Sequence, residues 1–166
     1  EIETYRMMAL LGLPVARTAA PALAQAEQEL ADLAQAIRSA HHDEEADLLE
    51  RLTRLAGQVE GQYASQHSRF SASKAYFELV DRRIQDIRET RLPGFQSIGE
   101  FMDRRLSPAR STCDWVAKRQ TALSERVSRM SNLLRTRVDF QQEQSSQALL
   151  TAMNQRQGLS LIHISE

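Results

Sequence analysis

Apolar side chains recur at alternating intervals of three and four residues through most of this chain. One such run comprises Leu23, Ala26, Leu30, Leu33 and Ile37. A second run keeps the same spacing at Cys113, Val116, Gln120, Leu123, Val127, Met130 and Leu134. This spacing places the side chains on one face of a helix and is typical of helices that pack lengthwise. The pattern predicts an all-α protein, an elongated antiparallel, coiled-coil-like helical bundle with one long C-terminal helix.

Turn-forming residues are scarce, with only 6 Gly and 4 Pro among 166 residues. A many-stranded β fold needs more turns than these residues supply, and the common residues here are strong helix formers. The interruptions are Pro14, the turn at 41–43, a Ser-rich stretch at 65–73, Pro93-Gly94 and Ser107-Pro108. They predict helices over 1–13, 15–39, 44–66, 72–91, 97–106 and 108–155.

Two of these helix starts carry capping signals. Ser97 and Glu100 have the spacing of a capping box, and Ser107 precedes a proline at the first helical position. No Pro or Gly then follows until Gly158, so the last helix would reach about 70 Å. A rod of that length must bury its apolar stripe against other helices or a second chain, because an isolated amphipathic helix is marginally stable.

Both ends of the chain look incomplete. The first residue is not Met and already lies in a helical pattern, so we expect a segment before Glu1. At the other end, residues 158–166 change to strict alternation and resemble the translation of a transposase adapter used to prepare sequencing libraries. We interpret residues 1–157 as one helical domain fragment and 158–166 as a non-native tail. The alternative is a genuine C-terminal strand, although no partner strand is predicted.

Charge is unevenly distributed along the chain. Residues 1–66 hold 11 acidic and 5 basic residues, whereas residues 108–157 hold 4 acidic and 8 basic residues. This difference predicts that acidic early helices lie against a basic late helix. No tight basic cluster with aromatic side chains accompanies the late helix, so we expect no nucleic-acid partner. The longest uninterrupted apolar run is too short to span a bilayer.

The densest group of possible metal ligands is the run of His41, His42, Asp43 and Glu44. These residue types bind divalent ions, but their spacing matches no metal motif. The alternative is an exposed turn whose acids lie at a helix N-terminus, where the helix dipole favours negative charge. These four residues are therefore only weak metal candidates, and we predict no catalytic residue, no cofactor and no bound metal.

Other reactive or aromatic residues have structural explanations. Cys113 lies on the apolar stripe, where a small buried residue is expected, and Trp115 and Tyr76-Phe77 are expected to pack between helices. The arginine pairs could contact phosphates or lipid headgroups, or could bind acids one turn away. These pairs are Arg82-Arg83, Arg104-Arg105 and Arg135/Arg137.

Three stretches together carry a family resemblance. They are residues 1–11, a run from Ser71 to Val80 that continues through Pro93–Gln96 to Ala109, and Leu133–Val138 with Gln147–Leu150 and Met153-Asn154. These stretches resemble the bacterial membrane-anchored proteins of domain-of-unknown-function family 3422. The resemblance implies a mixed α/β region before Glu1 and a hydrophobic hairpin soon after Arg156. It assigns no functional residues, because the family has no established activity.

Three functions remain open at this point. The first is a non-catalytic structural or interaction segment, soluble itself, of a protein anchored in a bacterial inner membrane, with this region in the cytoplasm. Its partners would be a second copy or the N-terminal region, and the membrane through the hairpin. The second is the stalk of an oligomeric transporter or channel, by analogy with CorA-type magnesium channels. The third is an accessory part of an enzyme whose active site lies in the N-terminal region.

Overall fold

A computed structural model describes residues 1–163 and contains four helices. They are α1 (Ile2–Leu10), α2 (Gly12–Ser39), α3 (Glu45–Ile87) and α4 (Ile98–His163). Leu11, between α1 and α2, keeps helical backbone angles (φ −64°, ψ −19°), so these two helices form one bent rod. The described residues contain no strand, which confirms the all-α prediction.

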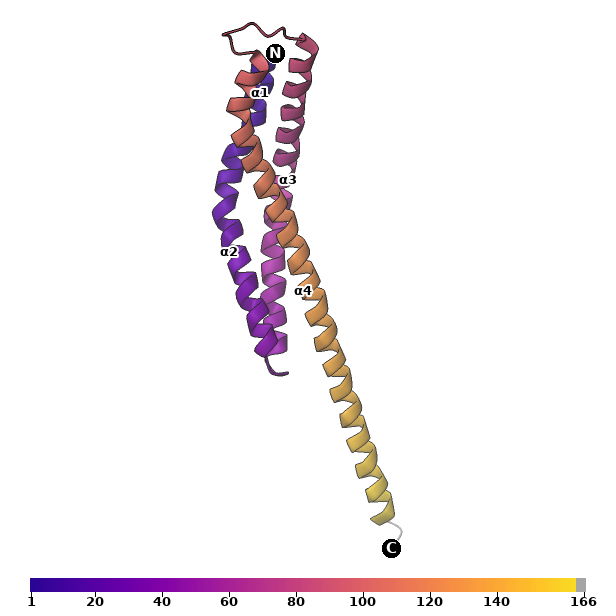
Figure 1. The fold of residues 1–166 in the computed structure, drawn as a ribbon. Coiled ribbons are helices and arrows are strands. Elements are labelled where there is room, and N and C mark those ends of the chain that lie inside the picture. The colour runs from indigo at the N-terminus through magenta and orange to yellow at the C-terminus, as the bar shows by residue number, and fades with distance from the viewer. Residues whose placement is uncertain (164–166) are drawn as a thin grey trace.

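The helices form three rods that lie side by side, and each rod runs antiparallel to the one before it, as Figure 1 shows. The α1–α2 rod runs away from the N-terminus, α3 returns, and α4 follows the first rod and continues beyond it. The N-terminus and the loop of residues 88–97 lie at one end, which we call the loop end. With 66 residues, α4 is about 100 Å long. Its last part stands clear of the other rods, and we call this the α4 end.

Pro14 does not interrupt the first rod, which was predicted to break there. The irregular residue is Leu11, and Pro14 lies in the first turn of α2. In that turn the backbone N–H groups lack intrahelical partners, so a proline costs little.

The Ser-rich stretch at 65–73 does not break α3, so the predicted helices 44–66 and 72–91 are one helix of 43 residues. Phe70 and Ser73 are buried within this stretch and hold it in the bundle. The helix ends at Ile87, because Arg88 takes a left-handed conformation (φ 51°) and its N–H bonds the Gln85 carbonyl.

Pro108 lies inside α4, so the predicted helices 97–106 and 108–155 are also one helix. The ring removes one backbone hydrogen bond, but Leu106 and Ala109 on either side are buried at 6% and 5% exposure. Burial of the side chains on both sides of Pro108 therefore outweighs the tendency of proline to end the helix. Helix α4 also continues beyond the predicted end at 155 to His163.

The predicted tail, 158–166, lies partly within the described residues. Gly158 to His163 are helical, not extended. Residues 164–166 lie outside the described residues. The helical conformation does not reveal the origin of the tail, so its non-native origin stays a prediction.

The predicted stripes form the core. A long cluster joins Leu23, Leu30 and Leu33 of α2 to Leu52 of α3 and Val116 of α4. A second cluster near the loop end includes Ala9, Phe77 and Leu106. Apolar faces at three-to-four spacing are thus buried between the rods, as the sequence predicted.

The rods approach most closely at Gly12. A Cβ atom placed on Gly12 would lie 2.5 Å from Ser73 Oγ and 3.3 Å from Cys113 Sγ. The Ser73 hydroxyl donates a hydrogen bond to the Ala9 carbonyl in the first rod. All three rods therefore meet here through small side chains.

One helical stretch, Ile2–Ser39, is long and apolar enough to cross a membrane by length and composition. Its most apolar window has a mean hydropathy of 1.4. The uninterrupted apolar run within this stretch is short, but the stretch as a whole is apolar because it contains many alanines. The same helix supplies Ala16, Leu23 and Leu30 to the bundle core, and a core helix passes the same test.

Candidate functional site

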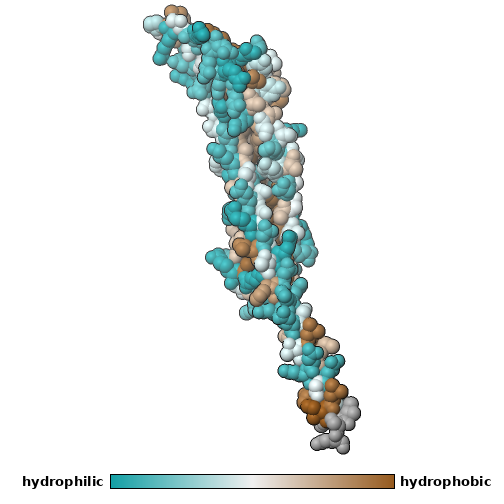
Figure 2. Space-filling model, turned by 90° about the vertical axis from the view of Figure 1, so that its right-hand side faces the viewer, coloured by the Kyte–Doolittle hydropathy of each residue, from teal (hydrophilic) through white to brown (hydrophobic). Residues whose placement is uncertain are grey.

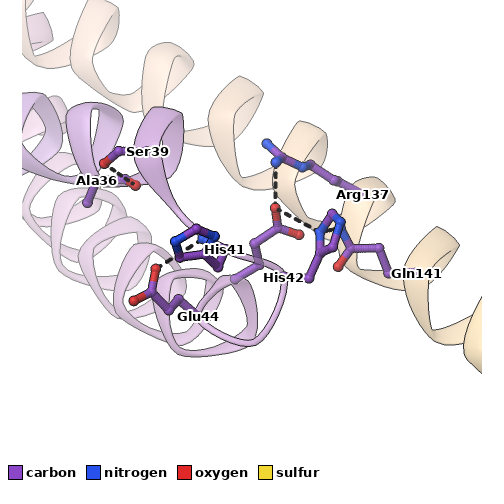
Figure 3. Close-up of polar contacts among 8 residues, drawn as sticks. Ala36, Ser39, His41, His42, Glu44, Arg137 and Gln141 are labelled. Atoms are coloured by element: carbon purple, nitrogen blue, oxygen red, sulfur yellow. Dashed lines mark hydrogen bonds and ion pairs between the residues drawn. The ribbon is translucent and has the colours of Figure 1, made fainter.

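The turn between α2 and α3 lies beside α4 at the level where α4 leaves the bundle. Val138 is the last buried residue along α4 in the described part of the chain. In the turn, the Glu44 N–H bonds the His41 carbonyl at 3.0 Å. The Glu44 carboxylate in turn accepts the His41 backbone N–H at 3.0 Å. These bonds fix the turn, from which His42 faces Gln141 of α4 (Figure 3) and the adjoining Glu45 pairs with Arg137 of α4.

Glu45 is the central residue of this polar cluster. Its side chain is fully buried, and the Arg137 Nη2 atom lies 2.6 Å from Glu45 Oε1. His42 Nδ1 lies 3.9 Å from the same oxygen and also contacts the Gln141 side-chain amide. Figure 3 shows Arg137 and Gln141 reaching from α4 toward the turn. The cluster therefore joins the α2–α3 turn to α4 through side chains only.

The Glu45 carboxylate depends on Arg137. Neither carboxylate oxygen accepts an aligned hydrogen bond from a described residue, so the ion pair is the main compensation for burying this charge. Arg137 is itself half-exposed, but removing it would leave the buried Glu45 charge without a cation, which is destabilising. Because Arg137 reaches Glu45 only when α4 lies against the turn, the pair acts as a clasp at this end of the bundle.

The predicted metal candidates do not assemble into a site. Among residues 1–163, no group of three His, Cys, Asp or Glu side chains is placed to hold a metal ion. His41, His42, Asp43 and Glu44 are all exposed, and Glu44 is engaged with the His41 backbone. Glu45, the buried acid next to them, already faces the Arg137 cation, which would repel a metal ion.

Comparison with known protein families identifies the family of this chain. The sequence model of a family described as "Protein of unknown function (DUF3422)" matches residues 1–162. The chain belongs to the DUF3422 family. A search of curated proteins and a search of solved structures each find no match. Membership of DUF3422 agrees with the resemblance drawn from the three sequence stretches and assigns no activity.

The other residues singled out in this DUF3422 chain are mostly structural. Cys113 is buried, and desolvation, together with the neighbouring Asp114 charge, raises the pKa of its thiol. A protonated, buried thiol is a poor nucleophile. Phe77 is buried and Tyr76 lies 6.2 Å from Tyr5 between ring centroids, as predicted. Trp115, in contrast, is 55% exposed, so the prediction that it packs between helices is wrong.

The predicted electrostatic match between early and late helices is confirmed in this DUF3422 chain. Arg119 of α4 forms an ion pair with Glu27 of α2 and stacks over Trp115 at 4.2 Å. Arg137 of α4 pairs with Glu45 of α3. Arg83 does pair with an acid one turn away, Asp86, at 3.7 Å. The basic late helix thus supplies cations to both acidic rods.

The DUF3422 bundle has a half-open groove of about 450 Å³ between α3 and α4. Its floor includes Phe70 and Phe77, and Lys74, Lys118 and Asp114 lie on its rim. The lining also includes Ser71 and His67, whose Oγ and Nε2 atoms lie 3.5 Å apart, at the outer limit of a hydrogen bond, and both residues are exposed to solvent. The two lysines are matched by Asp114 and Glu125, so the lining carries no net charge to orient a substrate. The groove therefore supports no catalytic assignment.

Proposed function

We propose that this DUF3422 segment is a non-catalytic, rigid helical spacer that holds two contact surfaces apart. The distribution of exposed large apolar side chains carries the proposal. At the loop end they are Met7, Met8, Leu11, Ile87, Leu92, Phe95, Ile98 and Phe101. At the α4 end they are Phe140, Leu149, Leu150 and Met153; Leu159, Leu161 and Ile162 are also exposed but lie in the predicted non-native tail, so the proposal does not depend on them. Between the two ends, the only described residues of this kind are Trp115 and Leu133.

Exposed apolar clusters mark contacts with other molecules, whereas isolated exposed apolar residues need no explanation. In Figure 2 the brown side chains of α4 gather at the lower end, below a surface that is largely teal and white. The middle of the rod thus has a mainly polar surface, whereas both ends expose clusters of apolar side chains that partners could cover.

The bundle has the stiffness that a spacer needs. Helix α4 runs without a break from one end to the other, about 100 Å by the standard rise per residue. The ion pairs of Arg110 with Asp81, Arg119 with Glu27 and Arg137 with Glu45 tie it to the other rods at three levels.

The positions of the chain ends support the assignment of partners. Glu1 lies at the loop end, paired with Arg83 at 3.0 Å, and α4 leaves in the opposite direction. An N-terminal α/β region, as the resemblance implies, would join at the loop end. A membrane hairpin after α4 would join at the other end. We propose these two as the partners that the spacer separates.

A distance measurement between two spin labels tests the spacer. Labels at Gln96→Cys and Gln144→Cys, in a Cys113→Ala background, would be separated by roughly 70 Å along α4. A narrow distance distribution near that value is expected. A broad distribution or a much shorter mean distance would show a hinge and contradict a rigid spacer.

A further inference from the structure

The loop of residues 88–97 is held in place by its own polar contacts. Glu89 accepts hydrogen bonds from two backbone N–H groups at the start of α4, those of Ile98 at 2.8 Å and Gly99 at 3.1 Å. The Ser97 hydroxyl oxygen accepts the Glu100 N–H at 3.0 Å, which is one of the two bonds of the predicted capping box. The Glu100 carboxylate pairs with Arg91 at 3.2 Å. The loop is therefore a fixed cap on the end of the rod.

This fixed loop displays apolar side chains outward. Phe95 is 75% exposed and Leu92 is 62% exposed, on either side of Pro93-Gly94. Phe101, one turn into α4, is also exposed and carries the Arg105 guanidinium 4.6 Å above its ring. Ordered loops seldom display such large side chains to water without a partner.

The charges around the loop favour an anionic partner. Several acids at this end are already engaged: Glu100 pairs with Arg91, Asp86 pairs with Arg83, and the Glu89 carboxylate accepts backbone N–H groups at the start of α4. Within the described residues, no ion pair occupies Arg82, Arg88 or Arg104. Among the acids of residues 86–103, Glu89 and Asp103 have no ion pair within the described residues, and they are outnumbered by the three unpaired arginines. The loop end thus combines exposed aromatic and aliphatic groups with an excess of unpaired cations.

We infer that the loop end docks on an anionic lipid bilayer, with Leu92 and Phe95 entering the interface and the arginines facing headgroup phosphates. Shallow insertion of a few side chains suits the tip of a narrow rod, whereas a stable protein interface needs roughly 800 Å² from each partner. A second copy docked end to end would bring Arg88 and Arg104 against their own equivalents and would be repelled. This orientation rests on the proposed function for the α4 end: with a hairpin anchored there, the rod lies along the membrane and separates the N-terminal region from the hairpin within the plane of the bilayer.

Vesicle co-sedimentation of the folded chain tests this docking. Vesicles of phosphatidylcholine mixed with phosphatidylglycerol are expected to bind it, and vesicles of phosphatidylcholine alone to bind it weakly. Replacing Leu92 and Phe95 by Ser should lower binding at least tenfold, because each exposed side chain loses its burial. Replacing Arg82 and Arg104 by Gln should lower it roughly fivefold for each arginine. All four side chains are exposed, so the variants should keep the wild-type circular dichroism.

Two matched controls separate the loop end from the rest of the rod. Leu149→Ser/Met153→Ser removes apolar groups from the α4 end, and Arg126→Gln/Arg135→Gln removes charges from the middle; both should leave binding unchanged. The inference is overturned by absent binding, by equal binding to both vesicle types, or by loss of binding in the controls alone. Light scattering that shows a dimer abolished by Leu92→Ser/Phe95→Ser would instead assign the surface to a second copy. The spin-label distance is independent of these outcomes.

Discussion

Gly12→Ala should destabilise the bundle, although alanine is the better helix former. Gly12 lies where α2 meets α3 and α4, and an added Cβ would be 2.5 Å from Ser73 Oγ and 2.7 Å from Ser73 Cβ. Ser73 is itself only 2% exposed and bonds the Ala9 carbonyl, so it cannot move aside freely. The substitution therefore forces the two rods apart or displaces that hydrogen bond.

The opposing effects can be compared in magnitude. Replacing a helical glycine by alanine gains up to about 1 kcal/mol from backbone entropy. Overpacking a close contact costs about 1–3 kcal/mol, and an unmade buried hydrogen bond costs about 1–3 kcal/mol more. The net loss in unfolding free energy should be about 1–3 kcal/mol. Gly57→Ala and Gly61→Ala are the matched controls, because an added Cβ meets nothing within 4 Å at either position. Each control should gain about 0.5–1 kcal/mol.

Urea unfolding followed by helical circular dichroism measures these differences. Gly12→Ala should lower the midpoint, whereas Gly57→Ala and Gly61→Ala should raise it. The double variant Gly12→Ala/Ser73→Gly should lose less stability than the sum of its two single variants, because it removes the atoms in conflict. If Gly12→Ala is as stable as the unaltered chain, or if the double variant is strictly additive, the close three-rod contact is wrong.

Three further predictions follow from single contacts. Arg137→Met should cost about 1–3 kcal/mol in urea unfolding, because it leaves Glu45 buried without a cation although Arg137 itself is half-exposed. Glu45→Leu/Arg137→Met should recover most of that loss, and equal stability of the two variants would disprove the clasp. Arg88→Gly should raise the thermal midpoint by relieving the left-handed residue that ends α3, a gain of up to about 1 kcal/mol, and a lowered midpoint would contradict this. The thiol pKa of Cys113 is raised in the folded state, so the free energy of unfolding should fall as pH rises above the ordinary thiol value of 9.0. Cys113→Ala should show a weaker fall, and an identical dependence of unfolding free energy on pH in both proteins would refute this prediction.

The bundle could be predicted from the sequence because burial repeats along it. Leu23, Leu30 and Leu33 share one helix face and are all buried, so the three-to-four spacing alone identifies the packed side of α2. The charge difference between early and late segments likewise indicated which rods would face each other, as the Arg119–Glu27 pair shows.

The interruptions were mispredicted because local preference was weighed without packing. The Ser-rich stretch and Pro108 both favour a break, but Phe70, Leu106 and Ala109 bury their side chains across these points and keep the helices continuous. The first rod bends at Leu11, a residue with no turn signal, and not at Pro14.

The clasp and the loop cap depend on register, which the sequence does not show. Glu45 and Arg137 lie on different rods, and their pairing requires the exact alignment of α3 against α4. Glu89 caps α4 from the other side of a loop, where the sequence pointed only to Ser97 and Glu100. The sequence pattern therefore pointed to the exposed residues His41 to Glu44, whereas in the structure the buried Glu45 next to them makes the ion pair to α4.

Small-angle X-ray scattering of the chain in solution tests most directly whether three continuous rods form one elongated bundle. The account predicts a maximum dimension of about 100 Å, set by α4. It also predicts a radius of gyration well above the roughly 15 Å of a compact domain of this length. A compact particle, with α4 folded back at Pro108 or α3 folded back in its Ser-rich stretch, would contradict it.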